Sequence, residues 1–439
     1  MNDPADALTL RPGVEIEEKD FARTLKHSNA CQAIVGFSHD AEVVSVGDPG
    51  QEILWRLVGQ PGGEGALVIA MIGDAELADR AAHNVDRGGG ITFFGAANFN
   101  HWLKYSESDE GVHCARTEVE NLMQNSRIIA VVGATGAQGG GLVRAILADA
   151  SSGFRARAIT RKANGEKAEA LRKLGAEVVE ADLDNEASLA KAFEGAYGAY
   201  CVTNYWEHFT PAKEVSQARN MAQAAKAAKL QHVVWSTLED TRKRVPLTDP
   251  RMPTLMEKYK VPHFDAKGGA DALFAQADVP TTYLLTAFYW ENFIYFGMGP
   301  KKGPDGKFAI TMPMGNARLS GIAAEDIGKC AYGIFHQGKQ WIGKRVGIAG
   351  DHVTGAQMAA DMSKSLNVEV AYNVVSPEVF RGFGFPGADD LGNMFQYYTE
   401  FEKEFTEARS LETSRSLNPE LLNFKTWLAK YKDRIPLEV

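Results

Sequence analysis

Short apolar runs and amphipathic stretches with helical spacing alternate along the chain from Arg127 onward. The apolar runs are RIIAVVG, FRARAITR, AEVVEAD, AYGAYCVTN and HVVWSTLE, and helical stretches such as NEASLAKAFEG separate them. This alternation is typical of βαβ units, whose strands lie parallel and are covered by helices. The pattern therefore predicts an α/β fold of the Rossmann type, with a doubly wound parallel sheet.

The chain changes its pattern again after Pro280. TTYLLTAFYWENF predicts one more strand with an aromatic loop, and the remaining residues mix strands, loops and helices. We expect this tail to form a smaller C-terminal α+β lobe at the carboxyl edge of the sheet, where such folds bind ligands. Residues 127–439 then divide into a Rossmann core of about 127–290 and a small lobe formed mainly by 291–439.

Residues 1–125 have a different pattern of apolar and polar positions. Strand-like runs (CQAIVGF, AEVVSV, ALVIAMI, GITFFG) are separated by helical pieces such as EEKDFARTLKH and DAELADRAAHNV, and a polar stretch follows. This segment predicts a separate small α/β or α+β domain, preceding the Rossmann core.

Charge confirms that the two parts differ. The chain of 439 residues carries a net charge of −9, but residues 1–125 hold 9 basic and 20 acidic residues, a balance of −11, so the remainder carries +2. An acidic domain repels nucleic acid, which excludes a direct DNA binder. It fits docking to a basic partner surface, although a solvated acidic face is the more common explanation.

Composition and motif spacing exclude several other classes. The sequence has no apolar run long enough to span a membrane, and its beginning, MNDPADALTLRPG, lacks a signal peptide pattern, so we expect a cytoplasmic protein. The cysteines are scattered without metal or disulfide spacing, which predicts reduced thiols: Cys31, Cys114, Cys201 and Cys330. Half of the histidines lie in residues 1–125, also without metal spacing, and we expect no metal site.

A glycine-rich turn stands between the first strand of the sheet and its helix, in VVGATGAQGGG. Gly133 would permit the tight turn, Gly136 would let backbone approach a pyrophosphate, and Gly139 would let the helix pack on the strand. The helix N-terminus adds free N–H groups and a partial positive charge. The motif predicts a dinucleotide site.

The ends of the next strands indicate which nucleotide this is. Arg161 and Lys162 stand where an NAD site usually has an acidic residue, and two cations suit the 2′-phosphate of NADP. We expect a preference for NADP over NAD of about ten- to hundredfold. The alternative is a solvated basic strand end.

Further candidate contacts follow the third and fourth strands. In ADLDN, Asp182 is placed to reach the adenine, whereas Asp184 or Asn185 would cap the next helix. In CVTNYWEHF, Asn204 and Tyr205 would lie over the cofactor; for the tyrosine ring, aromatic core at a strand end is an equally good interpretation.

Several motifs together carry a family resemblance. VVGATGAQGGG, ITRK, GAEVVEADLDN, VTNYWE, HFDAKG, FYWENF and GFPGADDLGNMF occur in this order. They resemble the NmrA-like family of atypical short-chain dehydrogenases, especially its NADPH-sensor branch. The resemblance covers 127–439 and does not extend to residues 1–125. It implies a Rossmann domain that binds NADP(H), and the family includes both reductases of quinone-like compounds and non-catalytic regulators.

The resemblance also implies residue roles. The pyrophosphate would be held by the glycine-loop residues Gly133, Thr135, Gly136, Gln138 and Gly139. Arg161 would hold the 2′-phosphate and Asp182 would lie near adenine. Asn204 and Lys267 would approach the nicotinamide.

VPHFDAKG holds the candidate catalytic residues. Active dehydrogenases of the wider superfamily use Tyr-x-x-x-Lys, and here His263 stands four residues before Lys267 in the position of the tyrosine. We expect Lys267 to contact the cofactor and His263 to be non-catalytic, while proton donation by His263 stays open because histidine titrates near neutral pH. Ser236 and Thr237, at the end of HVVWSTLE, are weaker candidates for substrate contact. Pro262 leaves open whether His263 precedes the helix.

Two functions follow from these observations. The first is a sensor or regulator that binds NADP(H), responds to the NADPH/NADP ratio and acts on a protein partner. The alternative is an NADPH-dependent reductase of a small apolar carbonyl, enone or quinone-like compound. A homodimer is one assembly that this interpretation allows.

Overall fold

The computed structural model describes residues 53–54, 71–72, 126–149 and 151–437. The chain divides into two units, Met1–Asn125 and Ser126–Val439. In the first unit, strands β1 (Ile53–Leu54) and β2 (Met71–Ile72) pair antiparallel. The other elements expected in residues 1–125, with the histidines and two cysteines of that segment, lie outside the described residues. The separate folding of this segment stays a prediction.

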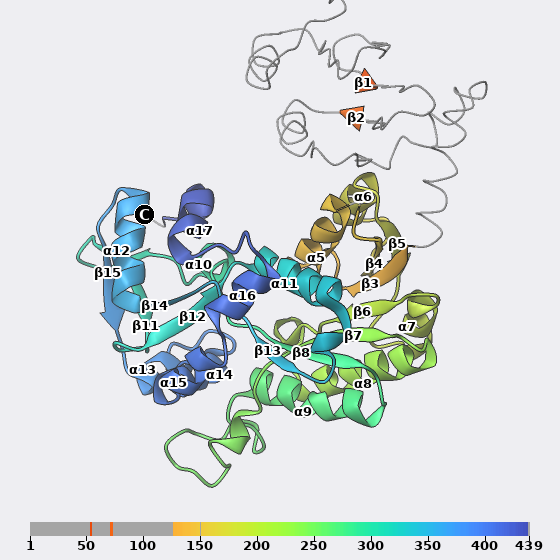
Figure 1. The fold of residues 1–439 in the computed structure, drawn as a ribbon. Helices are drawn as coiled ribbons and strands as arrows, with labels where there is room; N and C mark the ends of the chain where they lie inside the picture. Colours follow the sequence, from red (N-terminus) through yellow and green to blue (C-terminus); the bar gives the residue numbers. More distant parts are fainter. Residues whose placement is uncertain (1–52, 55–70, 73–125, 150, 438–439) are drawn as a thin grey trace, which may run out of the picture. The chain divides into compact units, whose positions relative to one another are not determined.

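A seven-stranded parallel sheet forms the centre of the second unit (Figure 1). Its strands are β3 (Arg127–Val132), β4 (Phe154–Thr160), β5 (Glu177–Glu180), β6 (Gly198–Cys201), β7 (His232–Thr237), β8 (Thr281–Leu285) and β13 (Arg345–Gly347). The order is β13-β8-β7-β6-β3-β4-β5, so the chain starts inside the sheet and winds toward both edges. This confirms the doubly wound fold, and it places the topological switch between β3 and β6.

Helices cover both faces of this sheet, which explains why the central strands are almost wholly apolar. Two hydrophobic clusters lie between the sheet and its helical layers. One layer contains α5 (Ala137–Ala148), α6 (Glu166–Lys173) and α11 (Ala324–Gln337), and the other contains α7 (Glu186–Phe193), α8 (Pro211–Ala227) and α9 (Pro262–Gln276).

Helices α5 and α11 pack unusually closely. A Cβ atom on Gly328 would lie 2.1 Å from the backbone nitrogen of Leu142, and one on Gly141 would lie 2.4 Å from the carbonyl oxygen of Glu325. Only glycine fits at such distances, so these positions hold the two backbones together.

The aromatic loop after β8 leads into the smaller lobe. It forms β9 (Phe288–Tyr289) and α10 (Asn292–Tyr295). The chain then rejoins the Rossmann layers through α11 and β13, which the sequence pattern had grouped with the lobe. Residues 291–439 are therefore only in part a separate lobe.

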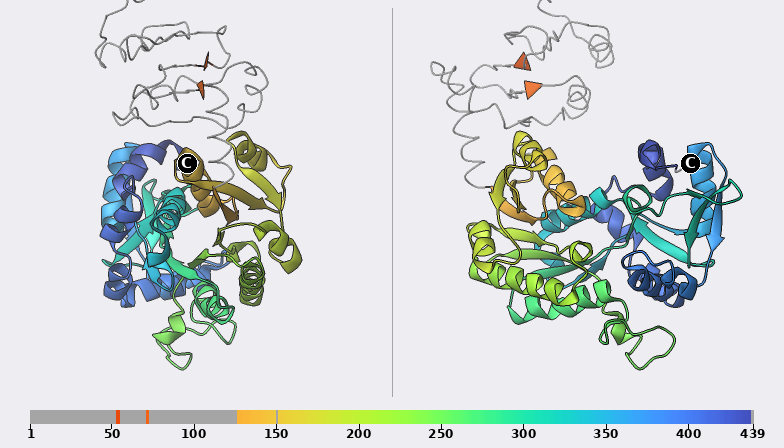
Figure 2. Two further views of the ribbon diagram at one scale, coloured as in Figure 1. Left: turned by 45° about the vertical axis from the view of Figure 1, so that its right-hand side comes forward. Right: turned by 180° about the vertical axis from the view of Figure 1, so that it is seen from behind.

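The lobe itself lies beside the Rossmann layers (Figures 1 and 2). Two three-stranded sheets, ordered β14-β12-β9 and β10-β11-β15, form it together with short helices. Its strands are β10 (Lys301–Lys302), β11 (Phe308–Met312), β12 (Arg318–Ile322), β14 (Asp351–Thr354) and β15 (Val370–Val374). Its helices are α12 (Gly355–Leu366), α13 (Pro377–Arg381), α14 (Ala388–Glu400), α15 (Glu402–Glu407) and α17 (Phe424–Tyr431), whereas α16 (Leu411–Leu417) packs on α11 of the Rossmann layers.

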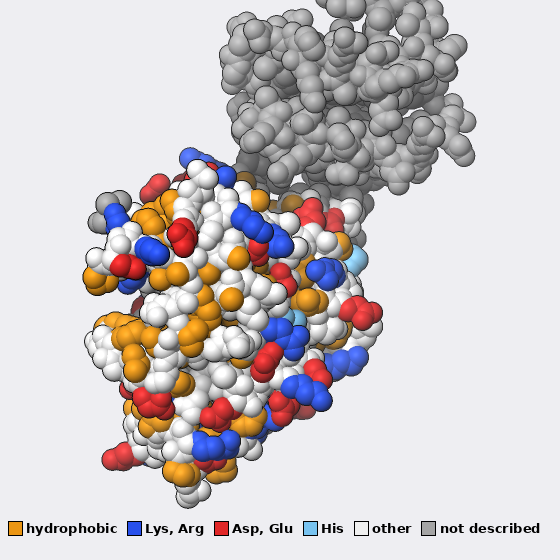
Figure 3. All heavy atoms as spheres, turned by 90° about the vertical axis from the view of Figure 1, so that its left-hand side faces the viewer, with side chains coloured by type: hydrophobic (Ala, Val, Ile, Leu, Met, Phe, Trp, Pro, Cys, Tyr) orange, Lys and Arg blue, Asp and Glu red, His pale blue; other side chains and the backbone are white. Residues whose placement is uncertain are grey.

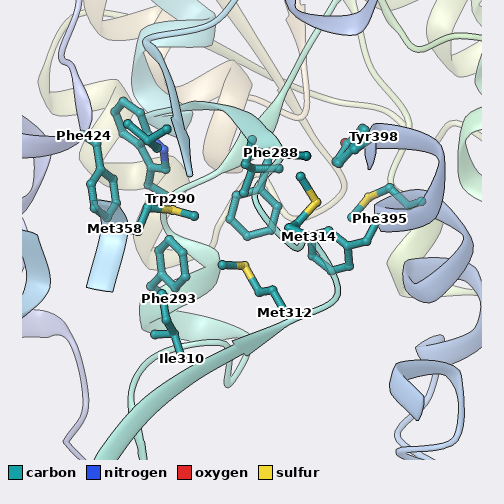
Figure 4. Packing of buried hydrophobic residues seen from close by; sticks show 14 of the residues in the cluster. Phe288, Trp290, Phe293, Ile310, Met312, Met314, Met358, Phe395, Tyr398 and Phe424 are labelled. Atoms are coloured by element: carbon teal, nitrogen blue, oxygen red, sulfur yellow. The ribbon is translucent and has the colours of Figure 1, made fainter. Parts of the chain in front are cut away.

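A third hydrophobic cluster fills the lobe. Phe288, Trp290 and Phe293 of the aromatic loop point into it, beside methionines and the aromatic rings of α14 and α17 (Figure 4). The loop thus supplies core residues, and Phe288 and Tyr289 of the same loop also border the cavity described below.

A buried arginine fixes the lobe to the Rossmann core. Arg409 has no exposed surface, and its guanidinium donates to both carboxylate oxygens of Glu239, at 2.6 and 2.9 Å, and to the carbonyl oxygen of Thr286. Glu239 follows β7 and Thr286 follows β8, so this contact ties the lobe to the carboxyl edge of the sheet.

Candidate functional site

A cavity of about 1730 Å³ extends from the glycine loop to the smaller lobe. It lies at the carboxyl ends of the strands, where doubly wound sheets bind ligands. The candidate site residues from the sequence all line it: Gly133, Thr135, Gly136, Gln138, Gly139, Arg161, Lys162, Asp182, Asn204, Tyr205, His263 and Lys267. The fold therefore brings together residues that are scattered over 135 positions of sequence.

The glycine loop has the shape that a phosphate cradle needs. Gly133 has φ of +64°, a left-handed conformation, and turns the chain from β3 toward α5. A Cβ on Gly139 would lie 2.5 Å from the carbonyl oxygen of Gly133, so only glycine permits this contact. No side chain caps the N-terminus of α5. Its first N–H groups are thus available for an anion, and the residues fit the pyrophosphate of a dinucleotide.

Gln138 was expected to hold the pyrophosphate, but its side-chain amide is bonded to three hydroxyl groups. Its Oε1 accepts hydrogen bonds from the hydroxyls of Tyr200 and Ser236, the latter at 2.8 Å, and its Nε2 donates to the hydroxyl of Tyr289. The amide therefore orders a buried group of hydroxyls, and it can contribute to the cradle only through its backbone. Burial raises the pKa of Tyr289 to about 12.

Arg161 at the end of β4 forms a bidentate ion pair with Glu207, in which Nη2 lies 3.0 Å from Oε2. This hydrogen bond raises the pKa of the Arg161 guanidinium, against a smaller effect of burial. Both side chains are about half exposed, so the pair contributes at most about 1 kcal/mol. The sequence did not identify Glu207 as the partner of Arg161, because Glu207 follows strand β6 and Arg161 follows strand β4.

We expect Arg161→Ala to weaken NADP binding about tenfold or more, because a charge-assisted hydrogen bond to the 2′-phosphate is lost. NAD, which lacks this phosphate, should bind within about twofold of its original affinity. Calorimetric titration of both nucleotides measures the difference, and Arg155→Ala, on the same strand but away from the cavity, serves as the control. An equal loss of affinity for both nucleotides would show that Arg161 does not bind the 2′-phosphate.

Asp182 and Asn204, the acidic and amide candidates, are both exposed at the cavity. Asp182 accepts a hydrogen bond from the backbone of Asp184 at 2.9 Å and remains exposed at the cavity. Asn185 caps α7 through the backbone nitrogen of Ser188, one of the two capping residues expected. Asn204 is exposed at the cavity, whereas Tyr205 is 2% exposed. The tyrosine ring is therefore packed among aromatic neighbours at the border of the cavity, and its contact with the cofactor stays a prediction.

Lys267 lines the cavity but is already paired. Its ammonium lies 3.0 Å from the carbonyl oxygen and 2.7 Å from the hydroxyl of Thr203, and 2.8 Å from the carboxylate of Glu214. An ammonium has three protons, so all of them have acceptors. A ribose hydroxyl would have to replace one of these partners, and the expected cofactor contact stays a prediction.

His263 lies in the first turn of α9, because the helix begins at Pro262. Its Nδ1 is 2.6 Å from Asp390 on α14, in the smaller lobe. The sequence identified His263 but not Asp390, because an aspartate in the first turn of a helix is common and nothing local indicates its partner. The hydroxyls of Ser236 and Thr237 bond to Gln138 and Asp271, which does not favour their contact with a substrate.

Three further observations concern metal ligands, membrane spans and the cysteines. Within the described ranges no three His, Cys, Asp or Glu side chains form a metal-binding group. No helix in that part of the chain is long and apolar enough to cross a membrane. Cys201 and Cys330 are buried free thiols, whose pKa burial raises well above the usual range.

The parallel sheet, the glycine cradle and the position of the cavity define a dinucleotide-binding protein of the Rossmann class. The model of the NmrA-like family matches residues 125–431. The chain belongs to this family, which confirms the resemblance seen in the motifs.

Proteins similar to this chain include a named oxidoreductase, a transcriptional regulator and a reductase. An NmrA-like family domain-containing oxidoreductase, FrzB of Cladobotryum sp., is 29% identical over 62% of this chain and 83% of its own length. NmrA, a negative transcriptional regulator solved with NAD, is 25% identical, with a TM-score of 0.58 over 70% of this chain and 95% of that one. Triphenylmethane reductase of Citrobacter sp., solved with NADP(H), shares the fold at 20% identity, with a TM-score of 0.55 over 69% and 99% of the two chains.

Proposed function

We propose that this protein binds NADP(H) and uses it to reduce a small apolar carbonyl, enone or quinone-like compound. The observation that carries this proposal is the size of the cavity, about 1730 Å³. Ligand sites usually enclose about 300–1,000 Å³, so there is room for a second molecule beside the nucleotide. The oxidoreductase names of curated relatives support the same function.

The part of the cavity beyond the cofactor residues suits an apolar substrate. Large hydrophobic side chains from the smaller lobe line it and remain exposed, including Phe296 at 67%, Phe383 at 47% and Phe385 at 40%. Monomeric proteins rarely expose several large apolar groups together unless they bind something there. Hydrophobic side chains also gather at several places on the outer face of this lobe (Figure 3).

Different residues would bind the cofactor and orient the substrate. The glycine loop and the N-terminus of α5 would bind the pyrophosphate, and Arg161 with Lys162 would bind the 2′-phosphate. Bound NADPH supplies a hydride. The aromatic walls would orient the acceptor and exclude water, which strengthens electrostatic interactions inside the site.

NADPH oxidation in the presence of quinones, enones and aryl ketones tests the proposal. We expect saturable loss of NADPH absorbance with at least one aromatic member of this panel, and slower loss with NADH. Tight NADPH binding without turnover of any compound would contradict the reductase function.

The sensor function is the second candidate, and the Arg161–Glu207 pair favours it. Glu207 ends the short helical turn η2 (Tyr205–Glu207), which also holds Trp206. A bound 2′-phosphate would compete with Glu207 for Arg161 and so would free this turn. A ligand shifts a conformational equilibrium only through such a differential interaction.

We expect Glu207→Gln to raise NADP affinity about two- to fivefold, because an exposed pair contributes at most about 1 kcal/mol. NAD affinity should not change. Calorimetry measures both constants, and Trp206 fluorescence reports whether η2 moves on binding. Unchanged NADP affinity would mean that Glu207 does not compete with the phosphate.

We further propose that residues 1–125 fold separately, act in the cytoplasm and offer an acidic surface to a partner. The contrast in charge between the two segments supports this boundary. A chain that begins at Gln124 should be soluble and should bind NADP as the full chain does. Insolubility, or a loss of NADP binding, would show that the two segments depend on one another.

A further inference from the structure

We propose that His263, oriented by Asp390, donates the proton in this reduction, and that the substrate is a flat aromatic carbonyl compound. This inference rests on the reductase function proposed above. It reverses the expectation from the sequence, in which Lys267 was the functional member of the pair and His263 was inert.

Asp390 holds the histidine at two points. Its Oδ1 lies 2.6 Å from Nδ1 of the ring, and its Oδ2 accepts the backbone N–H of His263 at 3.2 Å. The side chains are 7% and 4% exposed. Because Nδ1–H donates to the carboxylate, the neutral ring carries its proton on Nδ1, and the ring orientation is fixed.

The other ring nitrogen is left for a ligand. Among the described residues Nε2 of His263 has no hydrogen-bond partner, and His263 lines the cavity. This nitrogen is not among the fully buried side-chain atoms that lack a partner, so it keeps accessible surface where His263 borders the cavity. A base oriented by a carboxylate, with its second nitrogen turned to a pocket, is the arrangement of acid–base catalysts.

The surroundings of the ring indicate the class of substrate. The rings of Trp206, Phe264 and Tyr205 lie with centroids 4.8, 4.9 and 5.9 Å from that of His263. Burial, and next the charge of Asp390, raise the pKa of Tyr205 far above its usual value, so this hydroxyl stays protonated beside the pair. Tyr205 and Phe264 are buried, whereas Trp206 is partly exposed and lines the cavity, so a flat aromatic molecule beside His263 can stack on the Trp206 ring.

The reaction balances with these groups. The carbonyl carbon gains a C–H bond from the hydride, the π bond of the carbonyl breaks, and the oxygen takes the proton from Nε2 of the imidazolium. Asp390 stabilises the imidazolium before transfer, and solvent returns a proton to the neutral ring afterwards. Lys267, paired with Glu214 and Thr203, takes no part.

The first test needs no substrate. Nitrogen-15 NMR of the ligand-free protein, labelled at histidine, should show His263 in the Nδ1–H form when neutral, with His263→Gln identifying its signals. Asp390→Asn should abolish this signature. Asp326→Asn should not, because Asp326 is a buried aspartate of α11 outside the cavity that bonds to Asn418 and Leu422.

The second test uses phenanthrenequinone, a flat aromatic dicarbonyl, as the probe. We expect His263→Gln and Asp390→Asn to lower kcat about a hundredfold or more, the usual share of a general acid. Kd for NADPH should stay within about twofold, Asp390→Glu should recover part of kcat, and Asp326→Asn should match the wild type. If Asp390→Asn does not fold, His263→Gln alone decides the question.

Each negative result has a distinct meaning. An Nε2–H form of His263 in the wild type, or an unchanged kcat in His263→Gln, overturns the proton-donor role and leaves the reductase function in place. A wild type that turns over other members of the panel but not phenanthrenequinone overturns the substrate class. A wild type that reduces no member overturns the reductase function, and the role of His263 with it.

Discussion

Gly139→Ala is expected to lower NADP(H) affinity more than about tenfold and to destabilise the fold by about 1–3 kcal/mol. The added Cβ would lie 2.5 Å from the carbonyl oxygen of Gly133, 2.8 Å from its carbonyl carbon and 2.9 Å from the carbonyl oxygen of Val132. All three contacts are backbone atoms, which cannot turn aside. The N-terminus of α5 must therefore move away from β3, and the phosphate cradle opens.

The neighbouring glycine provides a matched control. A Cβ on Gly140 would lie 3.2 Å from the flexible end of Arg144 and 3.3 Å from the carbonyl oxygen of Ala134, so a shift of a few tenths of an ångström would accommodate it. Alanine is also favoured over glycine inside a helix by about 0.5–1 kcal/mol. We therefore expect Gly140→Ala to bind NADP normally and to be as stable as the wild type or more so. Denaturant unfolding and calorimetry compare the two variants, and similar behaviour of both would contradict the role assigned to Gly139.

Lys267→Met is expected to cost about 3–5 kcal/mol of stability, because it leaves a carboxylate buried without its cation. Glu214 has no exposed surface, and among the described residues the hydroxyl of Thr203 would still donate to it at 2.5 Å, while Nε2 of His208 lies 3.5 Å from its other oxygen. Replacing both members, in Lys267→Met with Glu214→Leu, removes the stranded charge and should recover most of the loss. Arg318→Ala serves as the comparison, because it breaks an exposed ion pair with Glu402. We expect it to lower the free energy of unfolding by about 1 kcal/mol or less.

The double variant also tests the role expected for Lys267. Because all three ammonium protons have partners, we expect NADPH affinity within about threefold of the wild type once stability is restored. A much larger loss would show that Lys267 exchanges a partner for the nicotinamide ribose, as the family resemblance implied.

The sequence predicted the parts of this protein that depend on local patterns. Apolar runs and glycine spacing depend on neighbouring residues, so the parallel sheet and the loop of Gly133 could be recognised. The partners of His263, Arg161 and Lys267 could not, because each comes from a distant element. Asp390 lies 127 residues from His263, and Glu207 lies 46 from Arg161. The expected residues did reach one cavity, but their pairing depends on the tertiary fold.

The return of the chain to the sheet through α11 and β13 limits how this protein can be re-engineered. A chimera that exchanges everything after residue 290 would remove the strand that pairs with β8 and the helix that packs on α5. Strand β8 would then present an unpaired edge, a known route to aggregation. A functional graft of the lobe must therefore exchange two separate segments, one between β8 and α11 and one after β13, and must leave α11 and β13 in place.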